Sequence, residues 1–133
     1  MKNSIKIIGA LTAIVFICDL KRRKEPPRIF VKDNISGGFN AKTVPPIGIF
    51  ISKSQMHNSN LIAHEKVHWK QYQELGLLGF YSKYLTEFVK YGYDNMPMEK
   101  QAREIESDYC KVNYTECVKK GIAKTVSNPN FRV

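Results

Sequence analysis

Two histidines four residues apart, in a stretch with the hydrophobic spacing of a helix, constrain this chain more than any other feature. Apolar residues recur there with the spacing of one helix face: Leu61, Ile62, Val67, Trp69, Tyr72 and Leu75. This spacing predicts a helix that begins near Ser59 and stops at Gly76. His64 and His68 lie inside it. Side chains four residues apart share one face of a helix, about 5–6 Å from each other, so both imidazoles can reach one metal ion.

The residue that follows the first histidine adds a chemical role. Zinc held by two histidines and a carboxylate keeps a fourth position for water and lowers the pKa of that water towards neutrality. Glu65 can take the proton of such a water. We therefore expect His64 and His68 to be zinc ligands and Glu65 to be the general base. The alternative is a pair of hydrogen-bonded histidines without a metal.

A third ligand has to come from a later element that folds back on this helix. The break at Pro97 predicts the start of another helix, and Glu99 lies in its first turn. The small residue Ala102, one turn on, would let the two helices approach closely. We expect Glu99 to be the third zinc ligand, with Glu104 and Glu106 as rivals. A carboxylate in a first helical turn also complements the helix dipole without binding any metal.

The strings LIAHEKVHWKQYQELG and YGYDNMPMEKQARE carry a family resemblance. The pattern H-E-x-x-H on one helix and E-x-x-A on a later one resembles the gluzincin-type zinc metallopeptidases, in particular the small members encoded by bacteria and their phages. The resemblance covers about residues 47 to 106. It implies a zincin-like fold and hydrolysis of peptide bonds, with His64, His68 and Glu99 as ligands and Glu65 as base. The chain differs in lacking room for the substrate-binding lobe of larger relatives.

Several residues around this pattern have both a functional and a structural interpretation. Gln71 either bonds a ligand histidine or is exposed to solvent. Tyr91 or Tyr93 either donates to the oxyanion or packs in the core. His57 precedes the helix and is expected in a loop. The predicted strand 47–51 either accepts an extended peptide at a sheet edge or is purely structural.

The remaining segments predict one small domain of the α+β class. With 133 residues and 43% apolar composition, the chain can build a single core. Strand formers at residues 29–31, turn residues at 34–38 and the strand 47–51 after Pro45-Pro46 predict a small antiparallel sheet, with 47–51 at an edge or a strand start. A second helix is expected at residues 78–90, and a third from about 97 to 120. The fold is thus mainly helical with a small antiparallel sheet, plus an N-terminal apolar helix.

The amino-terminal segment has its own character. Residues 7–18 form an uncharged run, while the first 24 residues hold six basic residues and one acidic residue, and so carry +5 of the formal charge of +9. An apolar segment beside basic residues is typical of attachment to an anionic membrane surface. The run is short for a spanning helix, so a buried helix and a cleaved signal are the alternatives. The residues before Asp19 fit a cleavage site poorly.

These observations divide the chain into residues 1–24 (an apolar segment with a basic flank, the candidate membrane anchor), 25–28 (a linker), 29–126 (a zincin-like metal-binding domain) and 127–133 (a tail). The three cysteines form neither a zinc pattern nor a disulfide framework. We expect a zinc metallopeptidase acting on a peptide or protein substrate. The alternative is a non-catalytic structural or interaction protein that docks to a membrane or a larger, phage-type assembly. Nucleic acid is disfavoured as a partner, and the location is either membrane-associated or cytoplasmic.

Overall fold

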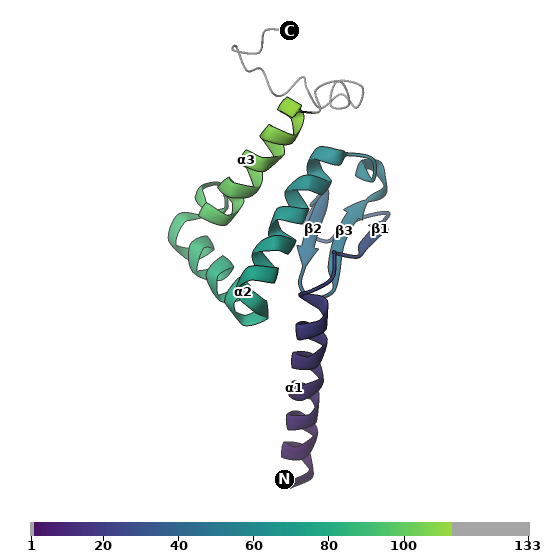
Figure 1. The fold of residues 1–133 in the computed structure, drawn as a ribbon, viewed down its shortest axis with the longest axis vertical. Coiled ribbons are helices and arrows are strands. Elements are labelled where there is room, and N and C mark those ends of the chain that lie inside the picture. Colours follow the sequence, from purple (N-terminus) through teal and green to yellow (C-terminus); the bar gives the residue numbers. More distant parts are fainter. Residues whose placement is uncertain (1, 113–133) are drawn as a thin grey trace.

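The computed structural model describes residues 2–112 and the side chains of residues 6–108. Within this part of the chain the predicted α+β class is confirmed, because the helices predominate and the strands form one small sheet (Figure 1). The elements in chain order are α1 (Lys2–Arg22), β1 (Ile29–Lys32), β2 (Ala41–Val44), β3 (Gly48–Ser52), the 3₁₀ turn η1 (Lys53–Gln55), α2 (Ser59–Tyr91), the 3₁₀ turn η2 (Tyr93–Asn95) and α3 (Pro97–Val112).

The sheet corrects two predictions. Its strand order is β1-β3-β2, with β1 parallel to β3 and β2 antiparallel to β3. The sheet is therefore mixed rather than antiparallel, because β1 and β2 do not pair across the turn residues that separate them. The segment 47–51 becomes the central strand β3, so of the two predicted alternatives the sheet edge is wrong, and the prolines mark the start of the strand. Its prolines stand in the preceding turn, where a missing N–H costs no sheet hydrogen bond.

The helix that carries His64 and His68 and the predicted helix after it form one helical run with a sharp corner. Asn58 caps α2, with its side chain accepting a hydrogen bond from the backbone N–H of Leu61. Gly76 interrupts the helical geometry with φ 76° and ψ 175°, a conformation that glycine adopts without steric cost. The predicted stop at Gly76 is thus confirmed as the corner at which the chain turns back towards α3.

The core lies where the two halves of α2 meet α3. Trp69, Tyr72, Phe80 and Met98 form the buried cluster. Ala102 is fully buried, in agreement with the close helix approach predicted for a small residue there. The predicted start of α3 at Pro97 is confirmed. Its predicted continuation to about residue 120, the domain boundary at 126 and the tail 127–133 lie outside the described residues.

Helix α1 extends away from the rest of the molecule, and only its last turn is held by other elements (Figure 1). The Tyr72 hydroxyl donates to the Asp19 carboxylate at 2.5 Å, and the Arg22 guanidinium lies over the Trp69 ring. The following linker is held too, because the Trp69 indole donates to the Glu25 carbonyl. Among the residues whose side chains are described, no helix combines the length and the apolar composition needed to cross a membrane.

Candidate metal centre

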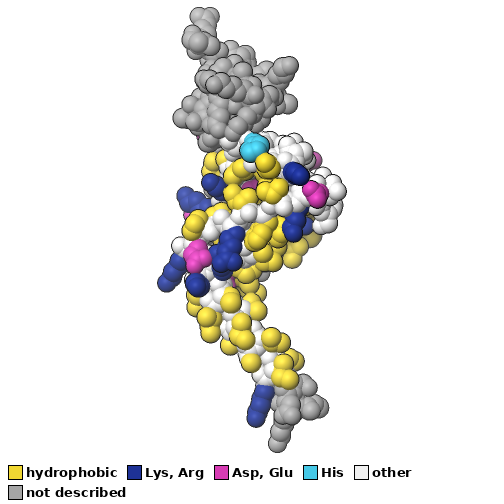
Figure 2. All heavy atoms as spheres, turned by 90° about the vertical axis from the view of Figure 1, so that its right-hand side faces the viewer, with side chains coloured by type: hydrophobic (Ala, Val, Ile, Leu, Met, Phe, Trp, Pro, Cys, Tyr) yellow, Lys and Arg dark blue, Asp and Glu magenta, His cyan; other side chains and the backbone are white. Residues whose placement is uncertain are grey.

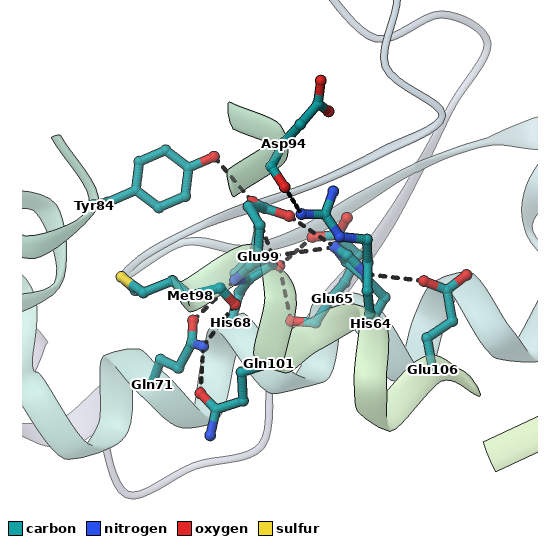
Figure 3. A network of polar contacts seen from close by, with 12 residues as sticks. His64, Glu65, His68, Gln71, Tyr84, Asp94, Met98, Glu99, Gln101 and Glu106 are labelled. Carbon is teal, nitrogen blue, oxygen red and sulfur yellow. Dashed lines mark hydrogen bonds and ion pairs between the residues drawn. The ribbon is translucent and has the colours of Figure 1, made fainter. Parts of the chain in front are cut away.

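Three buried side chains from α2 and α3 converge on one point (Figure 3). The Nε2 atoms of His64 and His68 lie 3.2 Å apart. The Glu99 carboxylate faces both, with Oε2 at 3.3 Å from His64 Nε2 and Oε1 at 3.3 Å from His68 Nε2. All three residues are at least nine-tenths buried, and one ligand atom from each can be chosen so that all lie within 4.8 Å of one another.

These separations match those of ligand atoms around a tetrahedral ion. Zinc–nitrogen bonds of about 2.0–2.1 Å at tetrahedral angles place neighbouring ligand atoms about 3.3 Å apart. The 3.2 Å between the two Nε2 atoms agrees with this value, and each oxygen of the Glu99 carboxylate lies 3.3 Å from one of these nitrogens. In addition, the buried Oε2 atom of Glu99 has no hydrogen-bond donor among the described residues. The donor set therefore fits a tetrahedrally coordinated metal ion held by His64, His68 and Glu99, and zinc is one ion of this kind.

The outer nitrogen of each imidazole has its own partner. His64 Nδ1 lies 3.0 Å from Glu106 Oε2, and His68 Nδ1 lies 2.9 Å from Gln71 Oε1. In the neutral tautomer that carries its proton at Nδ1, each imidazole donates to these oxygens, and its Nε2 lone pair then faces the common centre as a metal ligand would. Glu106, a rival for third ligand, thus contacts the far side of His64, and Gln71 has the ligand-orienting position predicted for it.

Gln71 also connects the two helices that supply the ligands. Its side-chain amide donates to the Met98 carbonyl at 3.1 Å and to Gln101 Oε1 at 2.8 Å. Met98 directly precedes Glu99. The residue that orients His68 on α2 therefore also holds the first turn of α3 in place, which is what brings Glu99 to the histidines.

The acidic surroundings change the protonation of the ligand group in the metal-free protein. Burial lowers the pKa of His64, but the neighbouring carboxylates of Glu106 and Glu99 outweigh this and raise it to about 9. Burial raises the pKa of Glu99, yet the two histidines reverse the effect and hold it far below the ordinary value. In the absence of a cation, a proton on His64 thus compensates the Glu99 charge, and a metal ion would replace that proton.

Glu65 lies beside this cluster without being one of its ligands. Its carboxylate accepts a hydrogen bond from the Thr43 hydroxyl on β2 at 2.5 Å. Burial raises the pKa of Glu65, while the bond from Thr43 and the nearby histidines oppose that shift. A buried carboxylate with a raised pKa, held beside a metal-ligand set, is well placed to accept a proton.

A cavity of about 140 Å³ opens over the cluster. It is bounded by the ligand residues and Glu65, by β2 from Ala41 to Thr43, and by aromatic side chains, chiefly Phe80, Tyr84 and Tyr93. The Tyr84 hydroxyl donates to Glu99 Oε1 at 3.1 Å. Burial and the Glu99 carboxylate raise the pKa of Tyr93 to about 12, so its hydroxyl keeps its proton near neutral pH.

Of the other residues singled out in the sequence, one lines the cavity and the rest are exposed away from it. Tyr93 lines the cavity, whereas Tyr91 is exposed at the end of α2 and does not. His57 is exposed in the turn before α2, as predicted for a loop histidine, and Glu104 is exposed on α3. Thr43 and Tyr84 were not anticipated. Tyr84 falls within the predicted helix 78–90, where nothing in the sequence indicates a contact with Glu99. No local pattern indicates that Thr43 contacts Glu65.

Comparison of the chain with protein-family models, with curated proteins and with solved structures finds no match. The proposed function is therefore supported by the geometry of the site and not by any relative.

Proposed function

We propose that this protein is a zinc-dependent peptidase of the gluzincin type, with His64, His68 and Glu99 as metal ligands and Glu65 as the general base. One observation carries the proposal. A buried glutamate that takes no part in the ligand set points into the same cavity as the ligands and is held there by Thr43. A purely structural zinc site needs no such carboxylate.

A zinc ion held by these ligands would lower the pKa of a water molecule and polarise the carbonyl of a peptide bond. Glu65 accepts a proton from the attacking water while the water oxygen bonds to the carbonyl carbon of the peptide. Glu65 then delivers that proton to the nitrogen as the C–N bond breaks, so a carboxylate and an amine leave. Tyr93, protonated at neutral pH, is the candidate donor to the oxygen that gains charge in between.

The substrate would lie along β2. The described strand order leaves β2 at one edge of the sheet, and its residues Ala41 to Thr43 border the cavity. An extended peptide that pairs with this edge would pass across the ligand group with its backbone held by hydrogen bonds. The cavity of about 140 Å³ is below the usual 300–1,000 Å³ of enclosed ligand sites, so the proposed substrate is a chain lying over the opening.

The test combines metal content with cleavage of a peptide library by the wild type, Glu65→Gln and Glu104→Gln. Glu104 is the matched control because it is an exposed glutamate outside the ligand group. We expect one zinc per chain in all three proteins, cleavage by the wild type and the control, and a loss of at least a hundred-fold in Glu65→Gln.

Two results would overturn the proposal. Zinc bound without cleavage by the wild type would favour the non-catalytic structural or interaction protein. Failure of the wild type to bind zinc, with Glu99→Gln behaving identically in metal titrations, would eliminate the metal centre itself.

A further inference from the structure

Helix α1 has an apolar surface on every side. Its large hydrophobic side chains are each at least half exposed: Ile7, Ile8, Leu11, Ile14, Val15, Phe16, Ile17 and Leu20. A helix that is hydrophobic all round is stable in water only when something covers it. Within the described residues only the last turn of α1 is held, through Asp19 and Arg22.

A groove extends this surface onto the body of the protein. It has a volume of about 540 Å³, lies between α1 and the corner of α2 at residues 75–79, and is lined mainly by apolar atoms. Leu78 at the corner is 70% exposed. Along the following part of α2, Leu85 and Val89 continue an exposed stripe at helical spacing, with 61% and 85% of their surface accessible. The uncovered apolar surface therefore includes both α1 and the second half of α2.

Positive charge borders this surface where α1 meets the body. Lys21 and Lys24 are exposed there, next to the partly buried Arg22 and Arg23. Figure 2 shows hydrophobic side chains along the projecting helix and basic side chains around its junction with the rest of the molecule. Lysines in this position match the negative charge of lipid headgroups beside a hydrocarbon layer.

We propose that α1 and the corner at residues 75–79 insert into the apolar layer of an anionic lipid membrane, with Lys21 and Lys24 among the headgroups. The charges favour lipid over a second copy of the chain. Parallel packing of two α1 helices would bring their basic junctions together, and antiparallel packing would place each junction beside Lys6 of the other copy. Both arrangements would place basic side chains next to one another, which is repulsive. An anionic bilayer would instead neutralise these positive charges. This inference does not depend on catalysis.

The test is flotation of the full chain with phosphatidylcholine vesicles prepared with and without phosphatidylglycerol. We expect binding to the anionic vesicles that weakens as salt is raised. Lys21→Glu combined with Lys24→Glu should reduce the partition coefficient by on the order of ten-fold or more. The matched control, Lys32→Glu with Lys53→Glu, reverses two exposed charges at the end of the sheet away from α1 and should bind like the wild type.

A second pair of variants tests the apolar contact. Val15 on α1 and Val31 on β1 are equally exposed, at 50% and 49%. Val15→Glu should lower vesicle binding at least ten-fold, and Val31→Glu should leave it unchanged. Equal circular dichroism and zinc content in both variants would show that neither change unfolds the chain. Equal loss of binding in both variants, or none in either, would overturn the proposed docking surface.

Exposed Cys18 on α1 provides a direct probe of insertion. In a Cys110→Ser, Cys117→Ser background, a polarity-sensitive fluorophore on Cys18 should shift to shorter wavelength with anionic vesicles. If the shift instead occurs without lipid, increases with protein concentration and is accompanied by dimers in light scattering, a second copy covers α1 and the membrane proposal is wrong. No shift under either condition would also refute insertion.

Discussion

The hydroxyl of Thr43 on β2 lies 2.5 Å from the Oε2 atom of Glu65 on α2, and 2.9 Å from the backbone carbonyl of the same residue. This contact joins the edge strand to the helix that carries the candidate ligands. It gives the edge strand two roles in the proposed enzyme. The backbone of β2 would hold the substrate, and one of its side chains holds the base.

Thr43→Val keeps the shape of the side chain and removes the hydroxyl. Because a hydrogen bond to a carboxylate favours its charged form, its loss should raise the pKa of Glu65 further. We expect unchanged zinc content, kcat lower by roughly ten-fold, and the acid limb of the pH–rate profile moved to higher pH. The control is Thr86→Val, since the Thr86 hydroxyl bonds only within its own helix. An acid limb that does not move would show that Thr43 does not position the base.

Glu106→Ala should weaken zinc binding without removing a ligand. The Glu106 carboxylate accepts from His64 Nδ1 at 3.0 Å, and loss of such a partner typically costs 10- to 100-fold in metal affinity. Competition with a fluorescent chelator measures the affinity, and exposed Glu104→Ala is the control. A loss of zinc as complete as in Glu99→Ala would instead make Glu106 a ligand.

The stability of the metal-free protein should depend on pH through the ligand group. Burial lowers the pKa of His64, but Glu106 and Glu99 raise it to about 9 in the folded state, against about 6.5 when unfolded. Its stabilising effect is therefore complete below about pH 6.5 and is lost as the pH rises through about 9. The lowered pKa of Glu99 has the opposite consequence, with stability lost as the pH falls below about 4.5.

Urea unfolding of the chelator-treated protein should thus show greatest stability between about pH 5 and 6.5, and a decrease of about 3 kcal/mol towards pH 9. Zinc affinity should rise over the same range, because the metal displaces the proton of His64. His64→Gln should abolish most of the alkaline decrease. If His64→Gln shows a decrease of equal size, the alkaline loss of stability comes from titratable groups other than His64.

Gly76→Ala tests the corner of α2. At φ 76° a methyl group is strained, and it would also approach the Arg23 guanidinium at 3.3 Å. We expect a loss of about 1–3 kcal/mol in the free energy of unfolding. Gly9→Ala is the control, since its Cβ would meet no atom within 4 Å and alanine is the better helix former. Equal stability of both variants would contradict the strained conformation.

Local sequence predicted the helical elements well, because their signals lie within one turn of the residues concerned. The predicted start near Ser59 and the predicted stop at Gly76 delimit the first half of α2, and Pro97 begins α3. The spacing of His64 and His68 likewise predicted a shared helix face. The sheet was predicted less well, since strand pairing joins residues far apart in sequence. Residues 29–32 pair with residues 49–52 rather than with the nearer β2, and no local pattern distinguishes the two arrangements.

The sequence by itself determined which residues can share an ion, because a helix places side chains four residues apart on one face whatever surrounds it. Only the tertiary structure decided which of Glu99, Glu104 and Glu106 faces both histidines, since all three lie on α3 and the answer depends on how α3 packs against α2. The contact between Thr43 and Glu65 likewise depends on the tertiary structure. The Thr43 hydroxyl meets Glu65 only because β2 occupies the sheet edge beside α2, a contact between residues 22 positions apart.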